Sequence, residues 1–374
     1  MASSTSRPAR ILNPFDPRPP HLVYATGREA GEVAAMTSVK EFRVEREATT
    51  DELGRGAFVF TDDYSVFDWG KMPDQIPDKG ASLCTMGAFN FELLEEAGVP
   101  THYRGVVENG EVRSLEEASR PPWQMAIDLT QTPKLPNEGL EYDYDSYHEA
   151  AGKNFLIPLE IVFRNRVPIG SSLRRRTEPA DHGLELEEWP DEPVDLPEPV
   201  VEFTTKYEES DRQLDRAEAD VIAGKADLDE LEDLALEVNR VITEQAAETE
   251  LVHQDGKIEC LYYKGDVGVA DVVGTFDENR FSYGATQLSK EVLRQYHKRT
   301  QPEWVQAVEA AKAQAKQEDI ADWRSLCDVE PKPLDDRVLE TARNMYCAGT
   351  NTYTGLDVFD APPLSSAIGS VQGL

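Results

Sequence analysis

The run VFRNRVPIGSS at residues 162–172 constrains this chain most, because it combines an extended segment with a tight turn. Arg164 and Arg166 are two residues apart, so their side chains share one face of a strand. A proline and a glycine then turn the chain toward Ser171. Guanidiniums bind phosphate oxygens through bidentate, charge-assisted hydrogen bonds, and a serine adds a hydroxyl and an N–H. The run predicts a phosphate-monoester site, although a strand with a solvated arginine face would show the same pattern.

The chain is strongly acidic, with 71 acidic and 38 basic residues and a formal net charge of −33. Such an excess repels nucleic acid and anionic membrane surfaces, so we expect neither as a partner. Because 40% of the residues are hydrophobic, a folded core is favoured over an acidic disordered tail. We interpret the composition as that of a cytoplasmic, halophilic enzyme from a salt-accumulating organism.

This charge predicts a protein whose stability depends on salt. Lowering KCl from about 1 M to about 0.1 M lengthens the Debye length from roughly 3 Å to roughly 10 Å, which restores repulsion between surface carboxylates. We expect the melting temperature, measured by calorimetry over a KCl series, to fall as salt is withdrawn. A melting temperature that stays constant or rises would contradict the halophilic interpretation.

The chain divides into five predicted segments. Residues 1–35 carry a net charge of +1, are rich in proline and show no regular period, so we predict a disordered extension. The four cysteines and six histidines form no CxxC or HExxH pattern, and no stretch is apolar over the roughly 18 residues of a membrane span. The other predicted segments are an N-terminal α/β lobe at 36–130, a hinge at 131–157, a second lobe at 158–300 and a C-terminal helical region at 301–374.

Apolar periodicity predicts the main helices and strands. A helix is expected around 80–97, and a longer one over 228–248, where an apolar stripe follows Asp227. Strands are expected within AFVFTDDY at 57–64 and LIPLEIVFRN at 156–165.

A second chemical cluster lies in residues 255–281, which predict a hairpin that turns around Lys264 and Gly265. If the loop has an odd number of residues, Glu259 lies opposite Asp271 on the return strand. Directly opposed carboxylates are destabilising unless a cation lies between them, and Mg²⁺ completed by nucleotide phosphates would satisfy such a pair. An even-length loop would instead place the two acids on opposite faces and leave Glu259 solvated.

Read together, these segments resemble the SAICAR synthetase (phosphoribosylaminoimidazole-succinocarboxamide synthase) family, in its longer archaeal-type form. The resemblance covers most of residues 36–300 and rests on six motifs in order. They are SVK at 38–40, YSVFD at 64–68 with IPDKG at 76–80, PLEIVFRNRVPIGSS at 158–172, LPEPVVEFTTKYE at 196–208, DGKIE at 255–259 and the DVVGTFDENRF run from Asp271.

The resemblance implies an α+β, two-lobe fold with a small strand-rich N-terminal lobe and an ATP-grasp-like C-terminal lobe. It implies an ATP- and Mg²⁺-dependent ligase of purine biosynthesis, which joins L-aspartate to the carboxylate of the aminoimidazole ribonucleotide CAIR through an acyl phosphate and yields SAICAR, ADP and phosphate. A homo-oligomer is also implied. Another ATP-dependent carboxylate–amine ligase, or a small-molecule kinase, would share the lysines and metal carboxylates but would not need the phosphate motif at 164–171.

The resemblance also implies roles for individual residues. Lys40 and Lys257 would bind ATP, and Lys257 with Asp255 would orient the reacting centre. Glu259 and Asp271 would hold Mg²⁺. The residues implied in substrate binding are Arg164, Ser171 and Arg280 at the ribonucleotide phosphate, Asp68 and Asp277 at its polar groups, and Lys206, with Lys79 and Glu208 as further candidates.

Three departures from the family pattern limit this transfer. Asp211-Arg212 stands where many members have an acidic residue and a histidine, so the residues that bind aspartate stay unassigned. Phe276, preceded by one inserted residue, replaces a usual proline, and Val39 replaces a usual glycine before Lys40.

Overall fold

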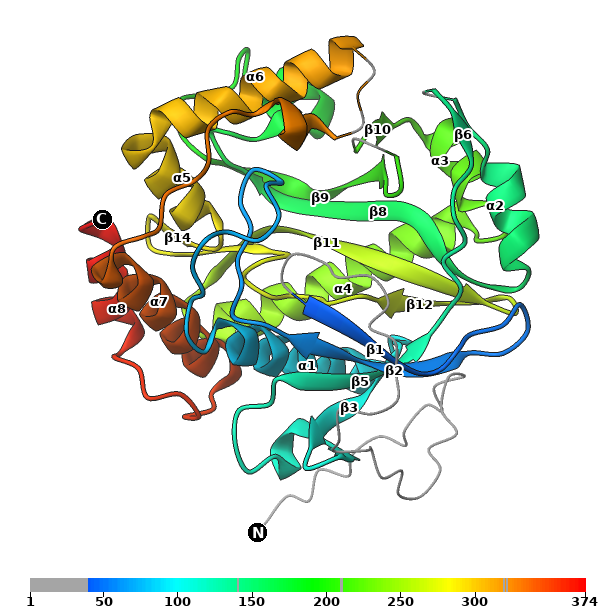
Figure 1. Ribbon diagram of the computed structural model, residues 1–374, viewed down its shortest axis with the longest axis horizontal. Coiled ribbons are helices and arrows are strands. Elements are labelled where there is room, and N and C mark those ends of the chain that lie inside the picture. Colours follow the sequence, from blue (N-terminus) through cyan, green and yellow to red (C-terminus); the bar gives the residue numbers. More distant parts are fainter. Residues whose placement is uncertain (1–39, 140, 209–210, 319, 321) are drawn as a thin grey trace.

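The computed structural model describes residues 40–374 except 140, 209–210, 319 and 321 (Figure 1). The predicted extension at 1–35 lies outside the described residues. No helix in the described part of the chain is long and apolar enough to cross a membrane.

The first part of the described chain forms an antiparallel sheet with the strand order β1-β2-β5-β3-β4. These five strands are β1 (Lys40–Arg46), β2 (Gly54–Phe60), β3 (Tyr103–Glu108), β4 (Glu111–Arg113) and β5 (Gln124–Leu129). The helix α1 (Lys79–Glu96) contacts β2, β3 and β5. Its position confirms the helix predicted around 80–97.

A second antiparallel sheet has the order β10-β9-β8-β11-β13-β14, with β12 paired to β11. Its strands within the described residues are β8 (Asn154–Val167), β9 (Val194–Thr205), β10 (Gln213–Leu214), β11 (Val252–Tyr263), β12 (Asp266–Ala270), β13 (Arg280–Tyr283) and β14 (Thr286–Leu288). The small hairpin of β6 (Asn137–Glu138) and β7 (Glu141–Tyr142) lies between the two sheets in sequence. The strand predicted at 156–165 is confirmed as the central part of β8.

The predicted hairpin is confirmed, but its register is not the odd-length one. Lys264 and Gly265 form a two-residue turn with φ of 55° and 113°, the positive values that tight hairpins favour. Glu259 therefore pairs with Ala270, and the expectation that it lies opposite Asp271 is wrong.

Helices cover one face of the second sheet. The helix α4 (Leu228–Glu248) contacts β11, β8 and β9, and α3 (Arg216–Ala223) contacts β8 and β9 (Figure 1). The α4 helix begins where predicted, because the Asp227 carboxylate accepts hydrogen bonds from the N–H groups of Asp229 and Glu230.

The two sheets and the remaining helices share one hydrophobic core. The first sheet meets β12 through backbone bonds, since His102 donates to the Val269 carbonyl at 3.0 Å and Val269 donates to Pro100 at 2.8 Å. The remaining helices are α2 (Tyr144–Ala151), α5 (Glu291–Thr300), α6 (Pro302–Glu318), α7 (Asp336–Thr354) and α8 (Leu364–Gln372). Among these, α7 packs along α1 (Figure 1). The lobe boundaries themselves stay predictions.

Candidate active site

One face of the second sheet carries a row of charged side chains. Along β8, Glu160 and Arg164 alternate with buried apolar residues, so their side chains lie on the face opposite to α3 and α4. The register with β11 pairs Glu160 with Glu259 and Arg164 with Asp255. The sheet therefore aligns the motifs of distant segments on a single face.

Lysines separate the carboxylates at one end of this face. The Lys257 Nζ lies 2.5 Å from a Glu160 oxygen, 3.6 Å from Glu278 and 3.7 Å from Glu259. Lys206 from the end of β9 forms an ion pair with Glu259 and lies 3.9 Å from Glu160. The two opposed glutamates are thus stabilised by cations, as directly opposed carboxylates require.

Lys40 connects the first sheet to this cluster. It stands at the start of β1 and forms an ion pair with Asp271, which follows the last residue of β12. Asp271 has a left-handed backbone with φ of 58°, so the chain leaves the strand there. This turn brings the Asp271 charge close enough to Glu259 to raise the pKa of Glu259, even though the two residues are not paired across the hairpin.

The pKa shifts in this cluster follow from burial and from neighbouring charges. Burial and the Asp271 charge raise the pKa of Glu259. Burial also acts to raise the pKa of Asp271, but Lys40 and Lys206 outweigh it and hold that pKa below its ordinary value. Burial acts to lower the pKa of Lys206 and Lys257, yet the surrounding carboxylates raise both, so both lysines are cationic at neutral pH.

Arginines and carboxylates alternate at the other end of the face. Arg164 is buried and contacts Glu202 at 2.7 Å and Asp255 at 3.3 Å. Asp255 also pairs with Arg280 at 2.8 Å, and Arg176 reaches Glu202 at 2.7 Å. The structure therefore brings together Arg164, Asp255 and Arg280, two residues along β11 from Lys257.

Three other predicted residues lie in different surroundings. Ser171 is buried, and its hydroxyl accepts a bond from the Leu173 N–H at the start of a short helical turn. Asp68 has an exposed side chain and pairs with Lys312 at 2.5 Å. Asp277 pairs with the fully buried Lys79 at 2.6 Å. None of the three contacts the lysine or arginine clusters directly through the bonds described above, so their substrate roles stay predictions.

The sequence analysis missed several members of these clusters. They are Glu160, Glu202, Glu278 and Arg176. Glu160 had a usable signal, because a charged residue inside the apolar run LIPLEIVF is unusual in a strand that packs on a core. Arg176 and Glu278 lie in loops beyond the strands, where no period indicates their direction.

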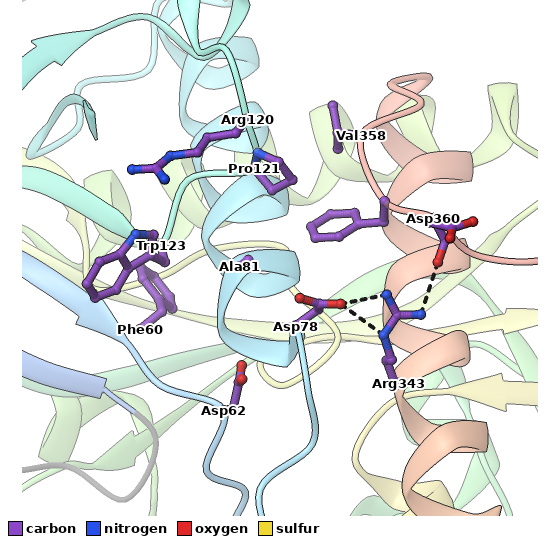
Figure 2. Close-up of a pocket in the computed structure, with 11 residues that line it drawn as sticks. Phe60, Asp62, Asp78, Ala81, Arg120, Pro121, Trp123, Arg343, Val358 and Asp360 are labelled. Carbon is purple, nitrogen blue, oxygen red and sulfur yellow. Dashed lines mark hydrogen bonds and ion pairs between the residues drawn. The ribbon is translucent and has the colours of Figure 1, made fainter. Parts of the chain in front are cut away.

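A pocket of about 450 Å³ shares no lining residue with this charged face (Figure 2). It is lined by parts of β2, α1, the segment before β5 and the segment after α7, including Phe60, Trp123 and Asp360. We place the candidate active site on the sheet face, because the predicted residues gather there.

A buried histidine supports the sheet from its opposite side. His253 on β11 is 3% exposed, and its ring nitrogens bond Thr243 of α4 and Asn279, each at 2.8 Å. Burial lowers the pKa of His253 from 6.5 to about 3. The native ring therefore stays neutral at a pH where the ring in the unfolded chain binds a proton.

This histidine predicts a loss of stability in mild acid. Below pH 6.5 the unfolded state gains a proton that native His253 cannot bind, so the free energy of unfolding should fall as the pH falls toward 3. Between pH 7 and pH 5 we expect His253 to contribute about 2 kcal/mol of this loss. Urea unfolding at fixed high salt measures it as the difference from His253→Gln. Parallel pH curves for the two proteins would contradict the assignment.

The geometry suits chemistry on anionic substrates. The described face presents cations from three strands, interleaved with carboxylates, while Cys84, Cys260 and Cys347 are buried. Such a site favours binding and charge neutralisation of phosphates and carboxylates rather than attack by a protein nucleophile. The fold and site thus define a two-sheet α+β enzyme that acts on phosphorylated substrates.

Comparison with known proteins identifies the family. The SAICAR synthetase family model matches residues 48–311. A phosphoribosylaminoimidazole-succinocarboxamide synthase of Thermoplasma acidophilum is 32% identical over 65% of this chain and 78% of its own. A protein of Archaeoglobus fulgidus that bears the same name provisionally is 41% identical over 90% of this chain and 99% of its own. The chain belongs to the SAICAR synthetase family and is a ligase of purine biosynthesis that uses ATP.

The solved structures support the fold. The Saccharomyces cerevisiae SAICAR synthase complexed with SAICAR matches with a TM-score of 0.59 and 20% identity, over 89% of this chain and 98% of that one. The predicted α+β fold of the SAICAR synthetase type is confirmed.

Proposed function

We propose that this chain joins L-aspartate to the carboxylate of CAIR on the charged face of the second sheet, with ATP as the source of energy. One observation carries the proposal: Lys40 of the first sheet meets Asp271 of the second, beside the Lys206 and Lys257 cluster and next to the arginine cluster along β11. A site of this kind can bind ATP phosphates at one end and a ribonucleotide phosphate at the other.

The proposed reaction proceeds in two steps. A carboxylate oxygen of CAIR attacks the γ-phosphorus of ATP, so the bond to the bridging oxygen breaks, ADP leaves and an acyl phosphate forms. The aspartate amine then attacks the acyl carbon, phosphate leaves, and the nitrogen loses a proton. Lys40, Lys206 and Lys257 are placed to neutralise the phosphoryl oxygens during the first step.

The arginine cluster would bind the ribonucleotide phosphate. The contacts of Arg164 to Glu202 and Asp255 use its Nε and Nη1, and its Nη2 carries two further donors. Arg280 contacts Asp255 through Nε and Nη2, so its Nη1 can donate in the same way. Ser171 follows Arg164 on the turn and would close this end of the site, while Asp68 and Asp277 would contact the polar groups of CAIR.

Glu259 and Asp271 fit a Mg²⁺ site. Both are buried carboxylates whose charges interact, and hard oxygen ligands of this number suit Mg²⁺ when phosphates complete its coordination. Their present partners, Lys206 and Lys40, are flexible cations that can turn to the phosphates. The ion, when bound, would neutralise charge on the transferring phosphoryl group.

A coupled ADP-release assay tests the proposed function. ADP formation is measured with the wild-type protein at about 1 M KCl, with CAIR and L-aspartate each omitted in turn. We expect release only when both are present, and SAICAR in equal amount to ADP.

The Asp271→Asn variant is the control for contaminating ATPase activity, since the same preparation should then release almost no ADP. Release that depends on neither CAIR nor aspartate, or that another amine supports equally well, would contradict the assignment. A cytoplasmic location and a homo-oligomeric state stay predictions of the sequence.

A further inference from the structure

The C-terminal helix α7 makes a continuous polar seam with α1. Arg343, Tyr346, Thr350 and Tyr353 recur at helical spacing, so they share the face of α7 that packs on α1. Ser82 of α1 donates to the Tyr346 carbonyl at 3.0 Å and bonds the Thr350 hydroxyl at 2.6 Å. The α7 helix begins at Asp336, beyond the residues 48–311 that match the family.

The first contact of this seam reaches a predicted substrate-binding residue. The Tyr346 hydroxyl donates to one oxygen of Asp277 at 2.7 Å, and Lys79 donates to the other at 2.6 Å. Tyr346 and Lys79 are fully buried, and the Lys79 Nζ lies 5.4 Å from the centre of the Tyr346 ring. The position of the Asp277 carboxylate is therefore set jointly by α1 and α7.

The second contact reaches the same loop from its other side. The Tyr353 hydroxyl donates to the Asn90 side-chain oxygen at 2.7 Å, and the Asn90 amide donates to the Gly274 carbonyl at 3.0 Å. Gly274 has φ of +71°, and a Cβ there would lie 2.3 Å from the Asn90 nitrogen. Asn90 therefore packs directly against the loop backbone, and Tyr353 fixes the direction of its amide.

An ion pair fastens the amino end of α1 to α7. Arg343 donates to one oxygen of Asp78 through Nε at 2.9 Å and through Nη2 at 2.6 Å (Figure 2). Asp78 directly precedes Lys79, the residue that holds Asp277. The pair thus keeps α7 in register with the start of α1.

We propose that Tyr346 and Tyr353 are positioning residues, through which α7 holds the loop 271–280 in the geometry that binds CAIR. This loop begins with Asp271 and ends with Arg280, so both ends of the charged face depend on its position. The inference rests on the proposed function for its kinetic readout, and on the hydrogen bonds above for its structural readout.

Tyr346→Phe tests the inference by removing one hydroxyl with little change in volume. We expect the KM for CAIR to rise about tenfold, with the KM for ATP changed less than about twofold, because the hydroxyl acts on Asp277 rather than on the ATP end. Tyr103→Phe is the matched control, since the buried Tyr103 hydroxyl also donates to a carboxylate, Glu92, at 3.0 Å, but in the first sheet. The control should leave both KM values unchanged.

A double-mutant cycle shows whether Tyr346 acts through Asp277. If it does, Tyr346→Phe combined with Asp277→Asn should have the CAIR KM of Asp277→Asn alone. Independent, multiplying effects would overturn the inference, as would a Tyr346→Phe variant that loses thermal stability like the Tyr103→Phe control but keeps the wild-type KM for CAIR.

Hydrogen exchange separates this inference from the proposed function, because it needs no activity. We expect amide exchange in peptides covering 271–280 to speed up about tenfold in Tyr346→Phe and in Tyr353→Phe, and to stay at the wild-type rate in Tyr103→Phe. Unchanged exchange in both α7 variants would overturn the positioning role even in an active enzyme. Faster exchange in a wild-type protein that fails the ADP-release assay would support the positioning role and remove only the proposed function.

Discussion

Asp271→Asn is expected to lower kcat by at least about a hundredfold while CAIR still binds. The substitution removes one of the two carboxylates proposed to hold Mg²⁺, and it also leaves Lys40 without its partner across the two sheets. Steady-state ADP release at saturating Mg²⁺ measures kcat, and the KM for CAIR should change little because the arginine cluster is intact.

The control for this variant is Glu108→Gln. Glu108 is also a buried carboxylate in an ion pair, with Arg113 at 2.9 Å, but it lies between β3 and β4, away from the charged face. It should lose stability and keep its turnover. If Asp271→Asn instead retains wild-type kcat, the carboxylate pair does not hold the metal and the placement of the ATP end is wrong.

Arg164→Ala should raise the KM for CAIR about ten- to a hundredfold and leave the KM for ATP nearly unchanged. A charge-assisted hydrogen bond to phosphate is worth about 1.5–3 kcal/mol, and each 1.4 kcal/mol corresponds to a factor of ten. The variant should also be less stable than the wild type, because Glu202 and Asp255 lose a buried cationic partner.

Arg113→Ala separates the two effects of that substitution. It removes a cation from the buried Glu108 without touching the charged face, so only the free energy of unfolding should fall. An Arg164→Ala variant that behaves like Arg113→Ala, with reduced stability and an unchanged KM for CAIR, would show that Arg164 only stabilises the sheet.

Local pattern was enough to predict much of the scaffold. The apolar stripe behind Asp227 predicted α4, and the run through 156–165 predicted β8, because helix and strand periods decide which residues share a face. The same alternation placed Arg164 on one face of β8. The recognition of six motifs in order then identified the family, which no single motif could do.

The detailed pairing of the site could not be predicted in this way. Whether Glu259 lies opposite Asp271 depends on a loop that differs by one residue, and a one-residue change moves every side chain to the other face. The left-handed conformation of Asp271 then restored the proximity that the register removed. Local sequence preference does not specify that combination.

The sequence by itself determined the secondary structure around the site, the family and the residue types that serve the reaction. The tertiary structure decided which charges meet, such as Lys40 with Asp271 and Arg164 with Glu202, and it brought Tyr346 of α7 to Asp277. The physical reason is that periodicity along the chain orients a side chain relative to its own strand or helix. Its partner is set only when sheets and helices distant in sequence pack around the common core.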